Sequence, residues 1–124
     1  MIKGVGTDIV KLARIEKSVE KFGDAFARRI LHQDEFAIYQ SHVQPINYLA
    51  KRFAAKEALV KALGIGFREG ICLSDVQVVN DAHGKPEIKL HNKAEAFMLK
   101  YKISTVHLSL SDEKDYALAF VVVE

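Results

Sequence analysis

Residues 52–64 constrain the fold most, because this alanine- and leucine-rich segment predicts a long helix that carries charges where a buried helix would not. Gly64, with Gly66 just beyond it, turns the chain after the helix rather than cradling a phosphate, since phosphate-binding glycines precede a helix. Glu57 and Lys61 are four residues apart and share one face of the helix. They form either an ordinary solvated ion pair or part of a site for a charged ligand.

A second carboxylate, Asp8, lies far upstream in the apolar, strand-like run 6–10. A charge without a partner in such a run would cost several kcal/mol, so Asp8 requires either a cation or a role as the cap of the helix that follows. Glu57 requires a cation as well. Two carboxylates from separate elements, with Lys61 beside one of them, predict a Mg²⁺ ion whose coordination is completed by water and phosphate oxygens.

The composition indicates one domain, residues 1–124, with a hydrophobic core of its own. No apolar run approaches the ~20 residues of a membrane span, and no apolar signal segment follows Met1, so we expect a cytoplasmic protein. Cys72 is the only cysteine, which excludes an intrachain disulfide and predicts a buried, inert thiol. The net charge of +2 is too small to imply general nucleic-acid binding.

The spacing of apolar residues predicts a strand over 2–10 and an amphipathic helix over 12–22. The other elements expected are helices over 24–30 and 34–40, the long helix ending at 64, a hairpin of 76–80 with 87–91, a helix over 92–101, and a hairpin of 105–111 with 116–123. Asp24, Asn47 and Asn92 are the expected caps of three of these helices. Helices gathered in the first half and paired strands in the second predict an α+β fold with a largely antiparallel sheet and a long central helix.

Three segments, 6–10, 52–64 and 107–112, together resemble the holo-acyl-carrier-protein synthase family of small bacterial 4′-phosphopantetheinyl transferases. The resemblance extends over essentially the whole chain and includes the turn 84–86. It implies a phosphopantetheinyl transferase-like fold and a Mg²⁺-dependent reaction of fatty acid biosynthesis. In that reaction, a serine hydroxyl of apo acyl carrier protein attacks the β-phosphate of coenzyme A. Phosphopantetheine is transferred to the serine, and adenosine 3′,5′-bisphosphate leaves.

The resemblance also implies roles for individual residues. Asp8 and Glu57 correspond to the metal ligands and, with Lys61, make up the catalytic set. Lys61 is expected to contact the phosphates and to stabilise or protonate the leaving group. The base that accepts the serine proton stays open among Glu57, a metal-bound water and another carboxylate such as Glu35.

Coenzyme binding is implied at a second group of residues. These are Arg52, Lys61, Gly64, Gly84, Pro86 and His107. Arg52 and His107 are expected at the 3′-phosphate of coenzyme A, and the Gly84-Lys85-Pro86 turn is expected near its nucleotide. Because His107 lies in an apolar strand, the alternative is a hydrogen-bonded core histidine.

Arg14, Lys17 and Lys21 lie opposite the apolar residues of the helix over 12–22. Such residues are usually no more than a solvated surface. In this family, however, the partner is an acidic acyl carrier protein, so the resemblance implies that these three residues dock the carrier and that Arg28 and Arg29 extend the patch. It also implies a homotrimer whose active sites lie between protomers.

One residue departs from the family pattern, because His32 stands where many members have threonine or serine. We expect this change to weaken the cap of the helix over 34–40. Two other classes of function remain alternatives. One is a non-catalytic module that docks an acidic protein or nucleic acid through its basic helix, and the other is a Mg²⁺-dependent pyrophosphate hydrolase that uses water as the acceptor.

Overall fold

The computed structural model describes residues 1–64 and 70–124; Gly66 lies outside this part of the chain. The elements are β1 (Gly4–Lys11), α1 (Leu12–Phe22), α2 (Asp24–Ile30), α3 (Gln33–Ser41), α4 (Pro45–Leu63), the short 3₁₀ helix η2 (Leu73–Asp75), β2 (Val76–Asn80), β3 (Pro86–Leu90), α5 (Asn92–Lys100), β4 (Val106–Asp112) and β5 (Tyr116–Val123). The predicted order of helices and hairpins is confirmed.

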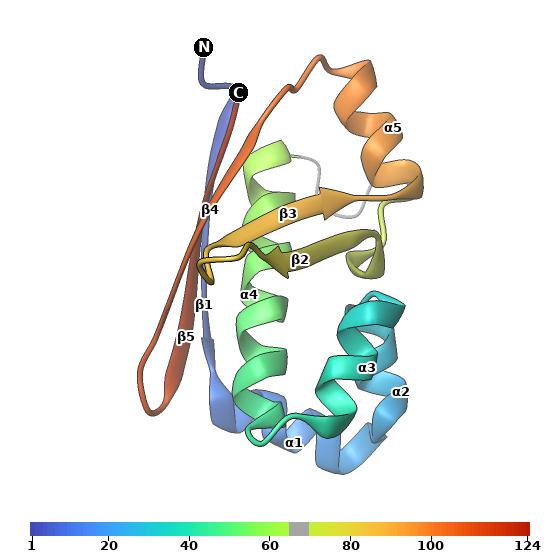
Figure 1. Cartoon of the computed structure of the whole chain (residues 1–124), viewed down its shortest axis with the longest axis vertical. Helices are drawn as coiled ribbons and strands as arrows, with labels where there is room; N and C mark the ends of the chain where they lie inside the picture. The colour runs from blue at the N-terminus through green and yellow to red at the C-terminus, as the bar shows by residue number, and fades with distance from the viewer. Residues whose placement is uncertain (65–69) are drawn as a thin grey trace.

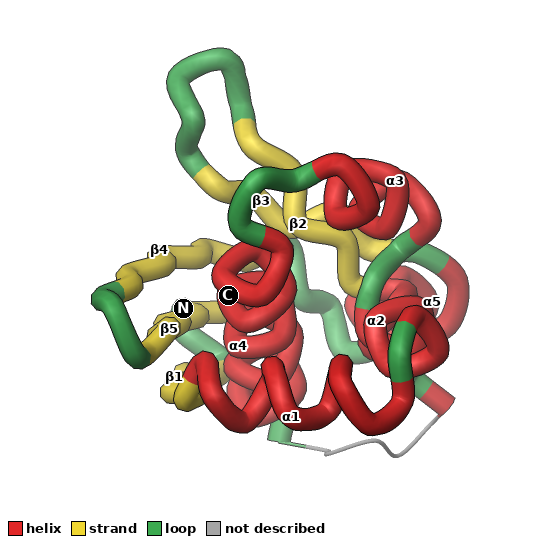
Figure 2. The backbone as a smooth tube through the Cα atoms, turned by 90° about the horizontal axis from the view of Figure 1, so that it is seen from below, coloured by secondary structure: helices red, strands yellow, loops and turns green. Residues whose placement is uncertain are grey.

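Two antiparallel sheets flank the long helix α4. The larger sheet has the order β1-β5-β4, with Gly6 and Leu108 both opposite Val121 of the central strand. The smaller sheet is the hairpin of β2 and β3. Helix α4 lies between the larger sheet and the other helices, with α1 beside it (Figures 1 and 2). This arrangement confirms the predicted α+β fold with a largely antiparallel sheet and a long central helix.

Small residues let α4 pack unusually close to the larger sheet. A methyl group at Gly6 would lie 2.0 Å from the carbonyl oxygen of Ala58, and one at Gly4 would lie 2.0 Å from that of Ala62. Side chains alternate along a strand, so Gly4, Gly6 and Asp8 face the same side of β1, toward α4. The two glycines therefore bring Asp8 against the helix that carries the other predicted catalytic residues.

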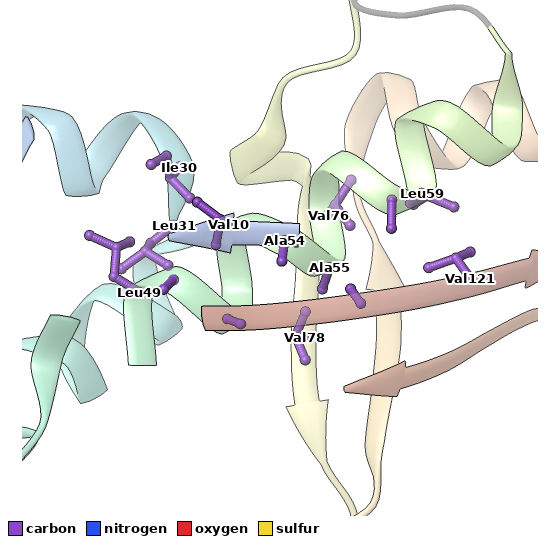
Figure 3. Packing of buried hydrophobic residues seen from close by; sticks show 14 of the residues in the cluster. Val10, Ile30, Leu31, Leu49, Ala54, Ala55, Leu59, Val76, Val78 and Val121 are labelled. Atoms are coloured by element: carbon purple, nitrogen blue, oxygen red, sulfur yellow. The ribbon is translucent and has the colours of Figure 1, made fainter. Parts of the chain in front are cut away.

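The core lies on both sides of α4 and joins it to the sheet and to the shorter helices (Figure 3). Its members are mostly aliphatic, and the figure labels Val10, Ile30, Leu31, Leu49, Ala54, Ala55, Leu59, Val76, Val78 and Val121. Valines and alanines of β5 close the core on the sheet side. Because both faces of α4 are covered along most of its length, the helix is fixed in position relative to β1 and α2.

No described element covers the outer face of the larger sheet, which carries several exposed apolar side chains (Figure 2). It carries Val5, Ile9, Tyr116, Leu118 and Phe120, whose exposed fractions lie between 40% and 61%. A sheet face in contact with water ordinarily alternates to polar residues. Exposed apolar patches are typical of surfaces that bind another protein, a membrane or a ligand.

The predicted caps of the long helix and of α5 were wrong. Helix α4 begins at Pro45 after Gln44, and the side chain of Asn47 instead donates to Asp112 Oδ2 at 3.1 Å. Asn92 is the first residue of α5, and its side chain donates to Asp75 Oδ1 at 2.9 Å. In both cases a contact distant in the sequence engages the amide, so the side chain does not bond the helix terminus.

Two other helix starts also differ from the expectation. Asp24 is the first residue of α2 and not its cap, which is Gly23 at φ 63°. His32, expected to weaken the start of α3, forms a complete capping box. Its Nδ1 accepts from the Asp34 N–H at 3.1 Å, and Glu35 Oε1 accepts from the His32 N–H at 2.8 Å. An imidazole nitrogen thus replaces the hydroxyl oxygen that usually accepts this bond.

We expect Gly6→Ala to destabilise the protein by about 1–3 kcal/mol, because the added methyl would overlap the main-chain oxygen of Ala58, which cannot move without displacing α4. Urea unfolding measures the change. Thr7→Ser, on the exposed side of the same strand, is the matched control and should stay within about 0.5 kcal/mol of the wild type. A Gly6→Ala variant as stable as the control would contradict the close packing of β1 on α4.

Candidate active site

Asp8 and Lys61 meet where β1 crosses α4. Lys61 Nζ donates to Asp8 Oδ1 at 3.0 Å and to the main-chain oxygen of Thr7 at 3.1 Å. The Asp8 side chain is 15% exposed, whereas that of Lys61 is 55% exposed. The residue before α1 is Lys11, so the alternative in which Asp8 caps that helix was wrong. In this structure the cationic partner of Asp8 is an accessible lysine, and the metal predicted at Asp8 stays a prediction.

Glu57 lies one helical turn before Lys61 and is partly buried. Burial raises the pKa of Glu57 above its ordinary value, and the Asp8 carboxylate raises it further. Lys61 and Arg14 act in the opposite direction. These four residues therefore place two carboxylates and two cations within electrostatic reach of one another, where β1, α1 and α4 come together.

The carboxylates of Asp8 and Glu57 fit a divalent cation. Their mutual repulsion, which contributes to the raised pKa of Glu57, is the interaction that a bound cation would relieve. Within residues 1–64 and 70–124, no group of three or more histidine, cysteine or acidic side chains is placed to hold a metal. A two-carboxylate site suits Mg²⁺, which takes few protein ligands and keeps its water and phosphate oxygens.

The base candidate Glu35 was wrong. Its side chain is 1% exposed, and Lys56 Nζ and the N–H groups of His32 and Val78 donate to its two oxygens. A serine on another protein cannot reach it. Sequence reasoning missed Lys56, whose side chain is fully buried. Its spacing could have predicted the burial, because Lys56 lies four residues after Arg52 and three before Leu59, on the same side of the helix, and that side is buried.

Arg52 is also inside the protein and is 6% exposed. Its guanidinium lies over the Tyr48 ring, 4.2 Å from the ring centre. Burial raises the pKa of Tyr48. The predicted contact of Arg52 with the coenzyme 3′-phosphate stays a prediction.

His107 is on the surface, so the alternative of a core histidine was wrong. Its side chain is 56% exposed, and its Nε2 lies 2.8 Å from Glu124 Oε1. The His107 side chain lowers the pKa of Glu124. An exposed imidazole at the sheet edge is available to a ligand.

The other predicted coenzyme residues lie in two places. Gly64 follows α4 with φ 75°, next to the end that carries Lys61. Gly84, with φ 82°, and Pro86 belong to the turn and start of the β2–β3 hairpin. That hairpin contacts β4, and β4 is separated from β1 by β5. One chain therefore does not bring His107 and the 84–86 turn to Asp8.

The predicted docking residues Arg14, Lys17 and Lys21 are exposed on α1. Where α1 ends, an apolar pocket of 580 Å³ opens between α2, α4 and the segment before β2. Its lining residues are Phe22, Ala25, Phe26, Arg29, Ile30, Phe53, Ile71, Cys72 and Leu73. Cys72 is exposed, so the expectation of a buried thiol was wrong.

The chain belongs to the 4′-phosphopantetheinyl transferase superfamily, whose family model matches residues 4–121. Within this class it is similar to the holo-[acyl-carrier-protein] synthases. It is 48% identical to that of Serratia proteamaculans, over 99% of this chain and 98% of the relative. The crystal structure of the synthase from Neisseria meningitidis is 48% identical, with a TM-score of 0.96 over 100% of this chain and 99% of that one.

A third relative is a structure with a ligand. The Helicobacter pylori synthase in complex with coenzyme A is 32% identical and has a TM-score of 0.84 over 97% of this chain and 99% of that one. These comparisons confirm the family and the fold expected from the sequence. They also show that the enzyme is a phosphopantetheinyl transferase. Among the described residues, no helix is long and apolar enough to cross a membrane.

Proposed function

We propose that this protein transfers the 4′-phosphopantetheine group of coenzyme A to a serine of apo acyl carrier protein through Asp8, Glu57 and Lys61. The observation that carries the proposal is the meeting of these three charged groups between β1 and α4, in a chain that matches holo-[acyl-carrier-protein] synthases over its length. The reaction leaves holo acyl carrier protein and adenosine 3′,5′-bisphosphate and serves fatty acid biosynthesis.

Asp8 and Glu57 would hold Mg²⁺, which would supply positive charge to neutralise the diphosphate. Lys61 is the accessible cation of the site, since its side chain is more than half exposed and it bonds Asp8 from the end of a long side chain. Its ammonium can turn to the phosphates and stabilise the negative charge that develops on the leaving bisphosphate. Of the two carboxylates considered as the base, only Glu57 is at the site.

Carrier docking on α1 is the second part of the proposal. Arg14, Lys17 and Lys21 are exposed there, and Arg14 is close enough to Glu57 to lower its pKa. A carrier whose acidic helix pairs with this face would present its serine beside the carboxylates. The apolar pocket, with Arg29 in its lining, continues the same surface and suits the apolar residues that flank an acidic docking helix.

We also propose a homotrimer with active sites between protomers. The uncovered face of the larger sheet, with its exposed apolar side chains, supports association, because exposed apolar patches are typical of protein–protein interaction sites. The separation of His107 and the 84–86 turn from Asp8 within one chain supports a shared site. We place the enzyme in the cytoplasm, where the exposed thiol of Cys72 would stay reduced.

Asp8→Asn and Glu57→Gln should each lower kcat by about a hundredfold or more, since each removes a charge that the bound cation requires. Incubation with coenzyme A, apo carrier and a Mg²⁺ series, followed by mass measurement of the carrier, detects the transferred group. Glu113→Gln, an exposed carboxylate in the β4–β5 turn, is the control and should be fully active. Full activity of either site variant would remove the metal assignment. Release of free phosphopantetheine would instead identify a hydrolase.

Arg14→Glu should raise the KM for apo carrier about tenfold with little change in the KM for coenzyme A, because charge complementarity acts on the encounter with the protein partner. Steady-state kinetics with each substrate varied in turn separates the two constants. Lys114→Glu, the same charge reversal in the exposed β4–β5 turn, should leave both constants unchanged. A normal carrier KM in the Arg14→Glu enzyme would show that the carrier docks elsewhere.

A mixture of Asp8→Asn and His107→Ala proteins should be more active than either alone. In a shared site, a mixed trimer contains interfaces that receive the intact Asp8 from one protomer and the intact His107 from its partner. The two proteins are denatured, mixed and refolded together, and turnover is compared with separately refolded samples, with light scattering to establish the oligomeric state. No gain on mixing, in a sample that forms trimers, would place both residues in one protomer's site.

A further inference from the structure

Lys56 and Glu35 form an ion pair inside the protein, and the proposed reaction uses neither. Lys56 Nζ lies 2.5 Å from Glu35 Oε1, and the two side chains are 0% and 1% exposed. Lys56 directly precedes Glu57, but consecutive residues on a helix point about 100° apart. Glu57 therefore faces the Asp8 site, whereas Lys56 points toward α2 and α3.

The Lys56 ammonium uses all three of its donors. Besides Glu35, it donates to the main-chain oxygen of Ile30 at 2.8 Å and to that of Leu73 at 3.2 Å. Ile30 is the last residue of α2, so no N–H group of the helix donates to its main-chain oxygen. Glu35 adds a link to β2, because its Oε2 accepts from the Val78 N–H at 2.9 Å.

The two main-chain oxygens that Lys56 binds belong to residues of different segments that both line the apolar pocket. Ile30 is in the α2 wall, and Leu73 is in the wall formed by the segment before β2. Phe53, one turn before Lys56 on α4, also lines the pocket. One buried ammonium therefore links two of the segments that line the pocket, α2 and the segment before β2, to the central helix α4.

Stability alone does not account for such a pair. Replacing a buried ion pair by apolar residues of similar size is often neutral or stabilising, because the charges lose their hydration. In agreement, burial lowers the pKa of Lys56, and the Glu35 carboxylate opposes this effect. What apolar side chains do not reproduce is directed hydrogen bonding to two particular main-chain oxygens.

We propose that Lys56 and Glu35 are positioning residues that fix α2 and the segment before β2 relative to each other at the pocket, and thereby determine the fit of the acyl carrier protein. This inference rests on the proposed function, since the carrier is the occupant that the adjoining basic face of α1 indicates. The pair acts on carrier recognition through Ile30 and Leu73 and does not contact the coenzyme.

The test uses the double variant Glu35→Leu/Lys56→Met, which removes both charges and fills the space with apolar atoms. We expect it to stay folded, as judged by circular dichroism and thermal unfolding, to raise the carrier KM about tenfold and to keep the coenzyme A KM within about twofold. Lys51→Met is the control on the same helix. Its ammonium is partly exposed and lies 4.0 Å from Asp112, so both constants should be unchanged.

A folded double variant with a normal carrier KM would overturn the proposal, as would an equal rise in both KM values. If the double variant does not fold, Glu35→Gln/Lys56→Met is judged by the same criteria. Methionine removes the bonds to the Ile30 and Leu73 oxygens, the glutamine amide oxygen can still accept from a main-chain N–H, and no buried charge remains. Failure of the proposed function is a separate result. It would appear as absence of transfer by the wild-type enzyme or as a normal carrier KM in Arg14→Glu.

Discussion

The contact between the main chain of β1 and that of α4 is the constraint on which the rest depends. Gly4 and Gly6 leave no side-chain atoms between the strand and the carbonyl oxygens of Ala58 and Ala62. The alternation of the strand then directs Asp8 toward the helix, where Lys61 reaches it. A larger residue at either glycine would push the strand away and separate the charged groups, so the site is a product of close packing as much as of charge.

Helix α4 holds two lysine–carboxylate pairs with opposite properties. Lys61 and Asp8 are joined at the surface, where water can replace either partner and the bond can open for a ligand. Lys56 and Glu35 are joined in the interior, where separating them would leave a buried charge uncompensated. The first pair can therefore open to bind a ligand. The second pair can hold the neighbouring main-chain segments in fixed positions. Residues five positions apart on one helix serve these two purposes because they face different sides of it.

The sequence predicted what depends on local periodicity and on family motifs. The helix over 12–22, both hairpins and the end of α4 at Gly64 follow from spacing that the structure retains. What it could not predict depends on partners distant along the chain. Asn47 and Asn92 were assigned as caps, but Asp112 and Asp75 engage their side chains. The accessibility of Cys72 and the burial of Lys56 likewise depend on which elements pack above them.

The bare outer face of the β1-β5-β4 sheet has a consequence for a newly made subunit. While this face is uncovered it exposes apolar side chains, which favour nonspecific adhesion to other unfinished chains. If that face is covered only in the proposed trimer, then the rate of synthesis and the protein concentration determine what fraction of the chains is assembled and active. Catalytic capacity would then rise more steeply than the amount of polypeptide, because each site of the proposed trimer would need more than one molecule.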